Sequence, residues 1–185
     1  MHGLRREVLL RQLESLSIPY SFLELPDQPS MDDYAQLMQE KIESLVSKGL
    51  SYAGFGDIFL EDLRKYREDQ LDKVGVKAFF PLWKRDTKAL MKSFISEGFK
   101  TIVVCVNGEK LDSSFCGRVI DESFFNDLPD DVDPCGENGE FHTFCFDGPI
   151  FTKAINFQIG ETITKSYPAV DGNAGEVIYY FTDII

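Results

Sequence analysis

The chain has 185 residues, of which 43% are hydrophobic and 13% aromatic, enough for one sizeable core or two small ones. Its formal net charge is -12, and no basic stripe of the kind that nucleic-acid-binding proteins carry is visible. The composition therefore argues against disorder and against a DNA or RNA partner.

The opening stretch, MHGLRREVLLRQLESL, carries charges throughout its apolar run, so it resembles neither a signal peptide nor a membrane span. Four cysteines form no CxxC pair, and this spacing predicts neither a structural zinc site nor a disulfide framework. We therefore expect a reduced, cytoplasmic protein with no membrane partner and no bound metal.

The first half of the chain alternates helix and strand patterns. Apolar residues at helical spacing predict helices at 4–16, 30–49, 60–75 and 86–98. Between them lie predicted strands at 20–26, 51–57, 76–80 and 100–107. This alternation predicts an α/β fold with a mostly parallel sheet flanked by helices.

The pattern changes after Asn107. Residues 108–140 are polar and irregular, with one short helix expected at 122–128. Three strand-like stretches follow, FHTFCFDG, AINFQIGETITKSY and VIYYFTDII. We therefore predict two domains, 1–82 of nucleotide-binding type and 83–185 as a smaller α+β domain, with a soft boundary near 82–100.

Ligands bind beyond the carboxyl ends of the strands in open parallel sheets. That rule points to Pro26 and its neighbours, to the segment from Gly54 through Gly56 to Asp57, and to the segment 81–86. The glycines allow close approach of a ligand to the backbone, and Asp57 could bind a ribose hydroxyl or an ammonium group.

In the segment 81–86, Trp83 could stack on a ring and Arg85 could meet a phosphate or carboxylate. A plainer interpretation stays open for both segments. The glycines then only shape a turn, Trp83 belongs to the core, and Asp86 caps a helix.

The densest group of polar residues is the segment PCGENGEFHT. It can present Glu137, Glu140 and His142 to one small ligand, and His142 suits acid–base work near neutral pH. On a strand, Glu140 and His142 would share one face. The alternative is a hairpin loop whose carboxylates cap backbone N–H groups.

Eight acidic residues and no Lys or Arg occupy positions 121–140. Such a stretch could gather Mg²⁺, but a solvated acidic surface is the favoured interpretation. Cys135 is a conceivable nucleophile, although its only nearby activating partner in sequence is His142.

Several motifs together resemble the diphthine–ammonia ligase family. They are FGDIFLEDLRKYRE, FPLWKRDTKALMKSFISEGFKTIVVCV, DPCGENGEFHTFCFDGPIF and the opening MHGLRREVLLRQLESLSIPY. The resemblance implies a PP-loop ATP pyrophosphatase domain of the Rossmann-like HUP fold, joined to a family-specific C-terminal domain.

The resemblance also implies the chemistry. ATP with Mg²⁺ adenylates a small-molecule or protein carboxylate, pyrophosphate leaves, and ammonia or an amine displaces AMP. In eukaryotes and archaea the carboxylate belongs to diphthine on a translation elongation factor.

The resemblance further implies roles for three groups of residues. Gly54, Gly56 and Asp57 would lie near the nucleotide, and Trp83, Arg85 and Asp86 would line a substrate cleft between the halves. The substrate side would be formed by residues of the PCGENGEFHT segment, namely Gly136, Glu137, Gly139, Glu140, His142 and Thr143. Our own assignment makes His142 a proton-transfer group and Glu140 a binder of ammonia or amine.

The sequence departs from the family at its start, where a strand and a Ser-Gly-Gly-Lys-Asp-Ser type phosphate loop are expected and absent. We expect Met1 to be an internal family position, from a misplaced start codon or a truncation, and activity to be impaired. Strands left without neighbours would pair with each other or with a second copy of the chain. Two alternatives stay open: a non-catalytic binding module, and another PP-loop chemistry such as thiolation.

Overall fold

A computed structural model describes residues 3–26, 30–168 and 175–185. The chain divides into two compact parts, which are described separately. Residues up to Pro19 together with Asp86–Ile185 form the antiparallel part, and Tyr20–Arg85 form the parallel part. Among the described residues, no helix combines the length and apolar character needed to cross a membrane.

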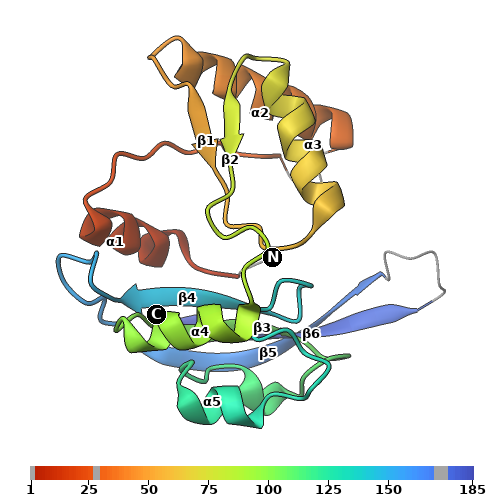
Figure 1. Ribbon diagram of the computed structural model, residues 1–185. Helices are drawn as coiled ribbons and strands as arrows, with labels where there is room; N and C mark the ends of the chain where they lie inside the picture. Colours follow the sequence, from red (N-terminus) through yellow and green to blue (C-terminus); the bar gives the residue numbers. More distant parts are fainter. Residues whose placement is uncertain (1–2, 27–29, 169–174) are drawn as a thin grey trace. The chain divides into compact units, whose positions relative to one another are not determined.

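The antiparallel part is built on a four-stranded sheet with the order β4-β3-β6-β5 (Figure 1). Its strands are β3 (Lys100–Asn107), β4 (Phe141–Asp147), β5 (Ile159–Pro168) and β6 (Glu176–Ile184), and all neighbours are antiparallel. The inner strand β3 contributes six consecutive buried residues, which explains its uninterrupted apolar sequence.

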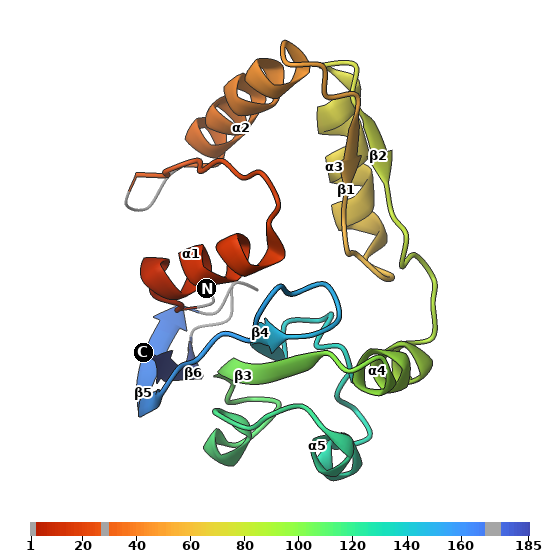
Figure 2. The ribbon, with the colours of Figure 1, turned by 90° about the vertical axis from the view of Figure 1, so that its left-hand side faces the viewer.

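Both faces of the inner strand β3 are covered. One core contains Val103, Val106 and Phe141 and lies under α4 (Thr87–Ser96), the 3-10 turn η1 (Ser113–Phe115) and α5 (Glu122–Asp127). The other core contains Ile102 and Phe144 and lies under α1 (Arg6–Leu16). Figure 2 shows α1 and α5 on opposite sides of the strands. Because β3 is buried on both faces, its sequence is continuously apolar, as is typical of a strand in a parallel sheet, although its neighbours are antiparallel.

Helix α1 is fixed to this sheet although it is far from it in sequence. The side chain of Val8 is 1% exposed and belongs to the second core. Gln12 Nε2 donates to the carbonyl oxygen of Cys145 at 2.6 Å, and Thr152 N donates to the carbonyl oxygen of Ser15 at 2.8 Å. The sequence pattern placed this helix with residues 20–82, whereas its contacts join it to the C-terminal strands.

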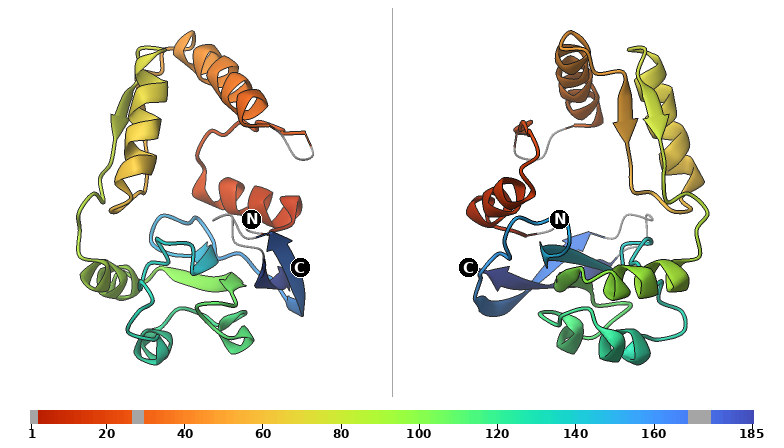
Figure 3. Two further views of the ribbon diagram at one scale, coloured as in Figure 1. Left: turned by 90° about the vertical axis from the view of Figure 1, so that its right-hand side faces the viewer. Right: turned by 60° about the vertical axis from the view of Figure 1, so that its left-hand side comes forward.

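The parallel part contains α2 (Met31–Val46), β1 (Tyr52–Gly54), α3 (Glu61–Asp72) and β2 (Lys77–Phe79). Strands β1 and β2 form a two-stranded parallel sheet (Figure 3). Ser30 begins α2 as predicted: its hydroxyl accepts from Asp33 N at 3.1 Å, and the Asp33 carboxylate accepts from Ser30 N at 3.2 Å.

The predicted mixed α/β architecture is confirmed, but its parallel sheet is smaller than expected. Strands β1 and β2 pair in parallel, whereas β3, which the alternation of helices and strands assigned to the parallel sheet, pairs antiparallel with β4 and β6. The predicted strand at 20–26 is wrong. The Phe22 carbonyl oxygen accepts from Lys41 Nζ at 2.9 Å, and the Tyr20 and Phe22 rings pack edge to face. This backbone group is therefore satisfied by a side chain rather than by a neighbouring strand.

Candidate functional site

The segment 133–140 is a tight loop organised by one carboxylate. Asp133 Oδ2 accepts from the backbone N–H groups of Cys135 at 3.1 Å and Glu137 at 3.0 Å. Gly136 has φ +68, and a Cβ built on it would lie 2.9 Å from the carbonyl oxygen of Phe141. Only glycine fits this position without strain, so the loop conformation is specified by Asp133 and Gly136 together.

Glu140 lies at the end of this loop with only 2% of its surface exposed. Its Oε1 accepts from Asp133 N at 3.0 Å and from Asn138 Nδ2 at 2.9 Å. Its carbonyl oxygen accepts from Asn107 N at 2.9 Å, which joins the loop to the end of β3. The buried Oε2 has no hydrogen-bond partner among the described residues.

A buried carboxylate oxygen without a donor is costly, because burial removes the water that would solvate its charge. Glu140 is held in place through one oxygen while the other remains able to accept a hydrogen bond. The arrangement is suited to receive an N–H donor, such as ammonium or a primary amine.

His142 and Thr143 follow on β4, where His142 pairs with Cys105 and Thr143 pairs with Val103. Adjacent strand residues point to opposite faces, so these two side chains leave the strand in opposite directions. Both are partly buried. Glu140 precedes β4, so the expected alternation that would bring Glu140 and His142 to one face does not apply to it.

Cys135 packs beside the start of α4, where its Sγ lies 3.5 Å from the carbonyl oxygen of Thr87. Burial raises the pKa of the Cys135 thiol to about 12, and the nearby carboxylates of Asp133, Glu137 and Asp86 act in the same direction. The thiol therefore stays protonated, which argues against a nucleophilic role. Asp86 caps α4 by accepting from Ala89 N at 2.7 Å, which matches the plainer interpretation of this residue.

Acidic residues before the loop have structural partners. Asp121 accepts from Phe124 N at 2.8 Å as the cap of α5, and Asp127 pairs with Arg118 at 2.7 Å. Within the described ranges, no group of three or more His, Cys, Asp or Glu side chains is placed to hold a metal ion. All four cysteines are free thiols.

In the parallel part, the segment after β1 carries Gly54, Gly56 and Asp57. No described heavy atom lies within 4 Å of a Cβ built on either glycine, so the backbone there is open to close approach. Asp57 is only 8% exposed, and its Oδ2 lies 3.0 Å from Arg67 Nε. Asp57 and Arg67 attract each other through their opposite charges, although the Nε–H group of Arg67 is not aligned for a hydrogen bond.

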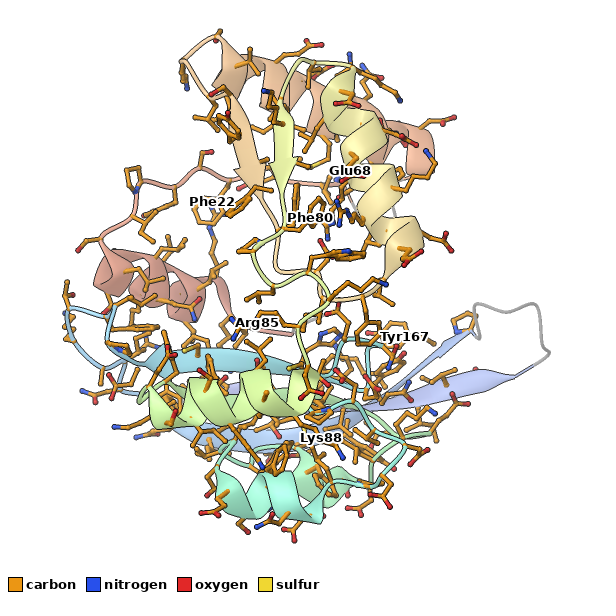
Figure 4. All side chains as sticks on the ribbon, viewed as in Figure 1. Phe22, Glu68, Phe80, Arg85, Lys88 and Tyr167 are labelled. Atoms are coloured by element: carbon orange, nitrogen blue, oxygen red, sulfur yellow. The ribbon has the colours of Figure 1, made fainter. Side chains whose placement is uncertain are left out.

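Two arginines of α3 pack on aromatic rings that follow β1 and β2. The Arg67 guanidinium carbon lies 4.5 Å from the centre of the Phe55 ring. That of Arg64 lies 4.6 Å from Trp83 and 4.9 Å from Phe80. Figure 4 labels Phe80 and Glu68, the latter an ion-pair partner of Arg64 at 2.9 Å. Neither arginine was predicted as a site residue from the sequence.

The structure thus gathers Gly136, Glu137, Gly139 and Glu140 in one loop, with Asp86 near it through Cys135. Trp83 and Arg85 belong to the parallel part, while Asp86 begins the continuous stretch of the antiparallel part. The predicted substrate cleft between the halves therefore stays a prediction. Asp133 and Asn138 were not predicted as site residues from the sequence. An Asx turn could have been predicted at Asp133, because its carboxylate can accept from backbone N–H groups two and four residues later.

Comparison with known families adds an independent observation. Residues 86–173 match the family model of the diphthamide synthase C-terminal domain. This matched range contains the whole Asp133–Glu140 loop and strand β4.

Curated relatives named diphthine–ammonia ligase are similar over a longer range. The zebrafish (Danio rerio) protein is 29% identical over 146 residues, covering 76% of this chain and 56% of that protein. The cattle (Bos taurus) protein is 28% identical over 145 residues, with 75% and 53% covered. The human (Homo sapiens) protein is 26% identical over 171 residues, with 89% and 61% covered. The chain thus spans between half and two thirds of these relatives.

Proposed function

Because this chain belongs to the diphthine–ammonia ligase family, we propose that it acts in ATP-dependent amide bond formation, with the loop 133–143 serving the nitrogen nucleophile. In this reaction a carboxylate is activated by adenylation, and ammonia or an amine then displaces AMP. The relatives' name specifies diphthine and ammonia; for this chain we propose a carboxylate and an ammonia or amine substrate of that class.

One observation carries the proposal. Glu140 is buried and held through Oε1, while Oε2 has no donor among the described residues. We assign Oε2 as the group that accepts an N–H of ammonia or of the neutral amine and so orients the nitrogen lone pair toward the activated carbonyl. A fixed acceptor lowers the entropic cost of bringing the nucleophile into position.

His142 is the proposed proton acceptor. Ammonia must lose a proton when it attacks an acyl carbon, and an imidazole can take that proton near neutral pH. Glu137 supplies a second carboxylate on the same loop, and Gly136 and Gly139 shape the loop surface that the substrate meets. Thr143 points to the opposite face of β4 from His142, so its proposed contact with the substrate is not assigned to this surface. These roles rest on their proximity in one loop and strand.

ATP with Mg²⁺ is the proposed energy source. Gly54 and Gly56 suit the approach of a nucleotide to the backbone, because the space at their Cβ positions is open. Asp57 suits a ribose hydroxyl less well, because Arg67 already occupies its carboxylate at 3.0 Å. We propose Trp83 and Arg85 as substrate-binding residues on the grounds of their ring and guanidinium chemistry.

The test measures AMP and amide formation by the full chain with Mg-ATP, ammonium and an elongation factor carrying diphthine. Glu140→Gln keeps the size of the side chain but removes its charge. We expect this variant to raise the KM for ammonium at least tenfold with a smaller effect on the KM for ATP. Asn126→Asp, an exposed change on α5, serves as the control for altered surface charge.

Calorimetry with Mg-ATP separates the remaining outcomes. ATP binding with unchanged ammonium kinetics in Glu140→Gln would remove Glu140 from the nucleophile site. Binding of the carboxylate partner without ATP binding or AMP release would instead identify a non-catalytic binding module. Either result contradicts the proposed function.

A further inference from the structure

Strand β5 is an edge of the antiparallel sheet, paired on one side with β6. Its residues 161–168 are all exposed, including Ile163 at 47% and Tyr167 at 36% (Figure 4 labels Tyr167). On the side away from β6, its backbone groups form no hydrogen bond to any other described segment. A long edge strand with exposed apolar side chains is a template for pairing with another strand.

The charges on β5 are placed symmetrically about one residue. Glu161 lies two residues before Ile163, and Lys165 lies two residues after it. All three side chains line one hollow on the same face, together with Phe181. Lys165 Nζ lies 5.2 Å from the centre of the Phe181 ring, and Glu161 forms no ion pair with any described residue.

We propose that β5 pairs antiparallel with β5 of a second copy of this chain, about a twofold axis that passes through Ile163. In this register Glu161 lies directly opposite Lys165 of the second copy, and the symmetry repeats the pair on the other side of the axis. Thr162 meets Thr164, and the two Ile163 side chains meet each other. Opposite charges and apolar side chains placed directly across two strands stabilise the pairing.

The charge pattern selects this register over its neighbours. Moving the axis to Thr164 places Lys165 opposite Ile163, and moving it to Thr162 places Glu161 opposite Ile163. Both alternatives separate the two charges from their partners. The pairing of β5 with β6 shifts register between Ile159 and Thr162, so Gly160 and Glu161 lie in a bulge. Glu161 nevertheless lines the same hollow as Ile163 and Lys165, and it is the first residue of β5 that the proposed pairing uses.

Twofold pairing also closes the assembly. The interface uses the same strand of both copies, so the two four-stranded sheets become one continuous sheet with no free β5 edge. The remaining outer strand of each copy is β4. A strand without a carboxylate opposite Lys165 would leave this lysine unpaired when it binds to the edge of β5. The edge therefore favours pairing with a second β5 over pairing with other strands.

Sedimentation velocity of the full chain, measured over a range of concentrations, tests the pairing. We expect a reversible dimer that weakens as NaCl is raised. Lys165→Glu and Glu161→Lys should each weaken the dimer at least tenfold, because like charges then face each other. The double variant with both changes should restore it. Lys48→Glu, an exposed change in the parallel part, is the control for net charge.

A cysteine crosslink tests the register. Ile163→Cys should form an intermolecular disulfide under mild oxidation, because the two residues face each other across the axis. Thr164→Cys should crosslink far less, since residue 164 faces residue 162. A monomer at all concentrations, single variants that leave the dimer unchanged, or a double variant that does not restore it would each overturn the proposal.

Discussion

Arg67 Nε lies 3.0 Å from Asp57 Oδ2, and the same guanidinium group packs over the Phe55 ring. This pair joins α3 to the segment that follows β1. Asp57 is almost fully buried, so its charge depends on Arg67 for compensation. The pair therefore provides a direct way to separate a structural role of Asp57 from a role in nucleotide binding.

Asp57→Asn should destabilise the parallel part by about 2 kcal/mol, because the change leaves the Arg67 charge uncompensated; the value allows for the partial exposure of Arg67. Hydrogen exchange of the β1 and β2 amides checks this locally. Asp62→Asn, on the exposed first turn of α3, should have little effect. A variant that loses ATP affinity while its exchange protection stays unchanged would instead assign Asp57 to the nucleotide.

Gly136→Ala and Gly139→Ala form a matched pair in the loop. Both glycines have positive φ, at +68 and +82, so each alanine should cost about 1 to 2 kcal/mol of stability. Gly136→Ala should cost more, because its methyl group would also lie 2.9 Å from the Phe141 carbonyl oxygen. Urea unfolding gives the difference. Equal effects of the two changes would contradict the close contact at Gly136.

The cysteines should react slowly with iodoacetamide in the folded protein. Burial raises the pKa of both Cys105 and Cys135 to about 12, so little thiolate is present at pH 8. Mass spectrometry of the alkylated peptides, with urea-unfolded protein as the reference, measures the protection. Rapid alkylation of Cys135 in the folded chain would reopen a nucleophilic role, and Cys135→Ser should otherwise retain activity.

The same shift predicts a loss of stability in alkali. The folded pKa of Cys135, about 12, lies above its ordinary value of 9.0. The unfolded state therefore releases the proton first as the pH rises above 9, and stability falls from there toward pH 12. Thermal unfolding of Cys135→Ala should show a weaker pH dependence in this range than the unchanged chain. Identical slopes would contradict the buried thiol.

Val8→Ala should destabilise the antiparallel part by about 1.5 to 3 kcal/mol, since Val8 is 1% exposed within the second core. Exchange protection of β3 and β4 amides reports on this part alone. Glu7→Ala on the same helix is the control, because Glu7 is exposed and alanine favours a helix. Equal loss of exchange protection in both variants would show that the destabilisation comes from a change in the stability of helix α1 and not from lost packing of Val8.

Local sequence signals predicted several elements well. The predicted helix starts at Ser30 and Asp86 are confirmed, and both side chains accept from N–H groups only three residues away. The strand Lys100–Asn107 was predicted with its observed bounds. Its partners were not, because a strand buried on both faces has the same sequence whether its neighbours are parallel or antiparallel.

In the candidate site too, residues marked by their immediate sequence neighbours were predicted, whereas contacts between distant segments were not. Glu140 was identified from its place in a glycine-containing loop, and the structure adds that Asp133 and Asn138 hold one of its oxygens. Arg64 and Arg67 lie on a charged helix where an Arg64–Glu68 pair at 2.9 Å is an ordinary surface feature. The aromatic rings beneath them belong to the segments that follow β1 and β2. The spacing of residues within α3 could not reveal these contacts.

The place of α1 has a consequence for the order in which the protein folds during synthesis. Val8 shares a core with Ile184 of β6, the last of the described strands along the chain. The ribosome makes α1 before β6, so the apolar stripe of the helix lacks this partner until β6 has been made. The parallel part, made of consecutive residues, can fold in the meantime. Until β6 emerges, the apolar stripe of α1 is an exposed site to which a chaperone can bind.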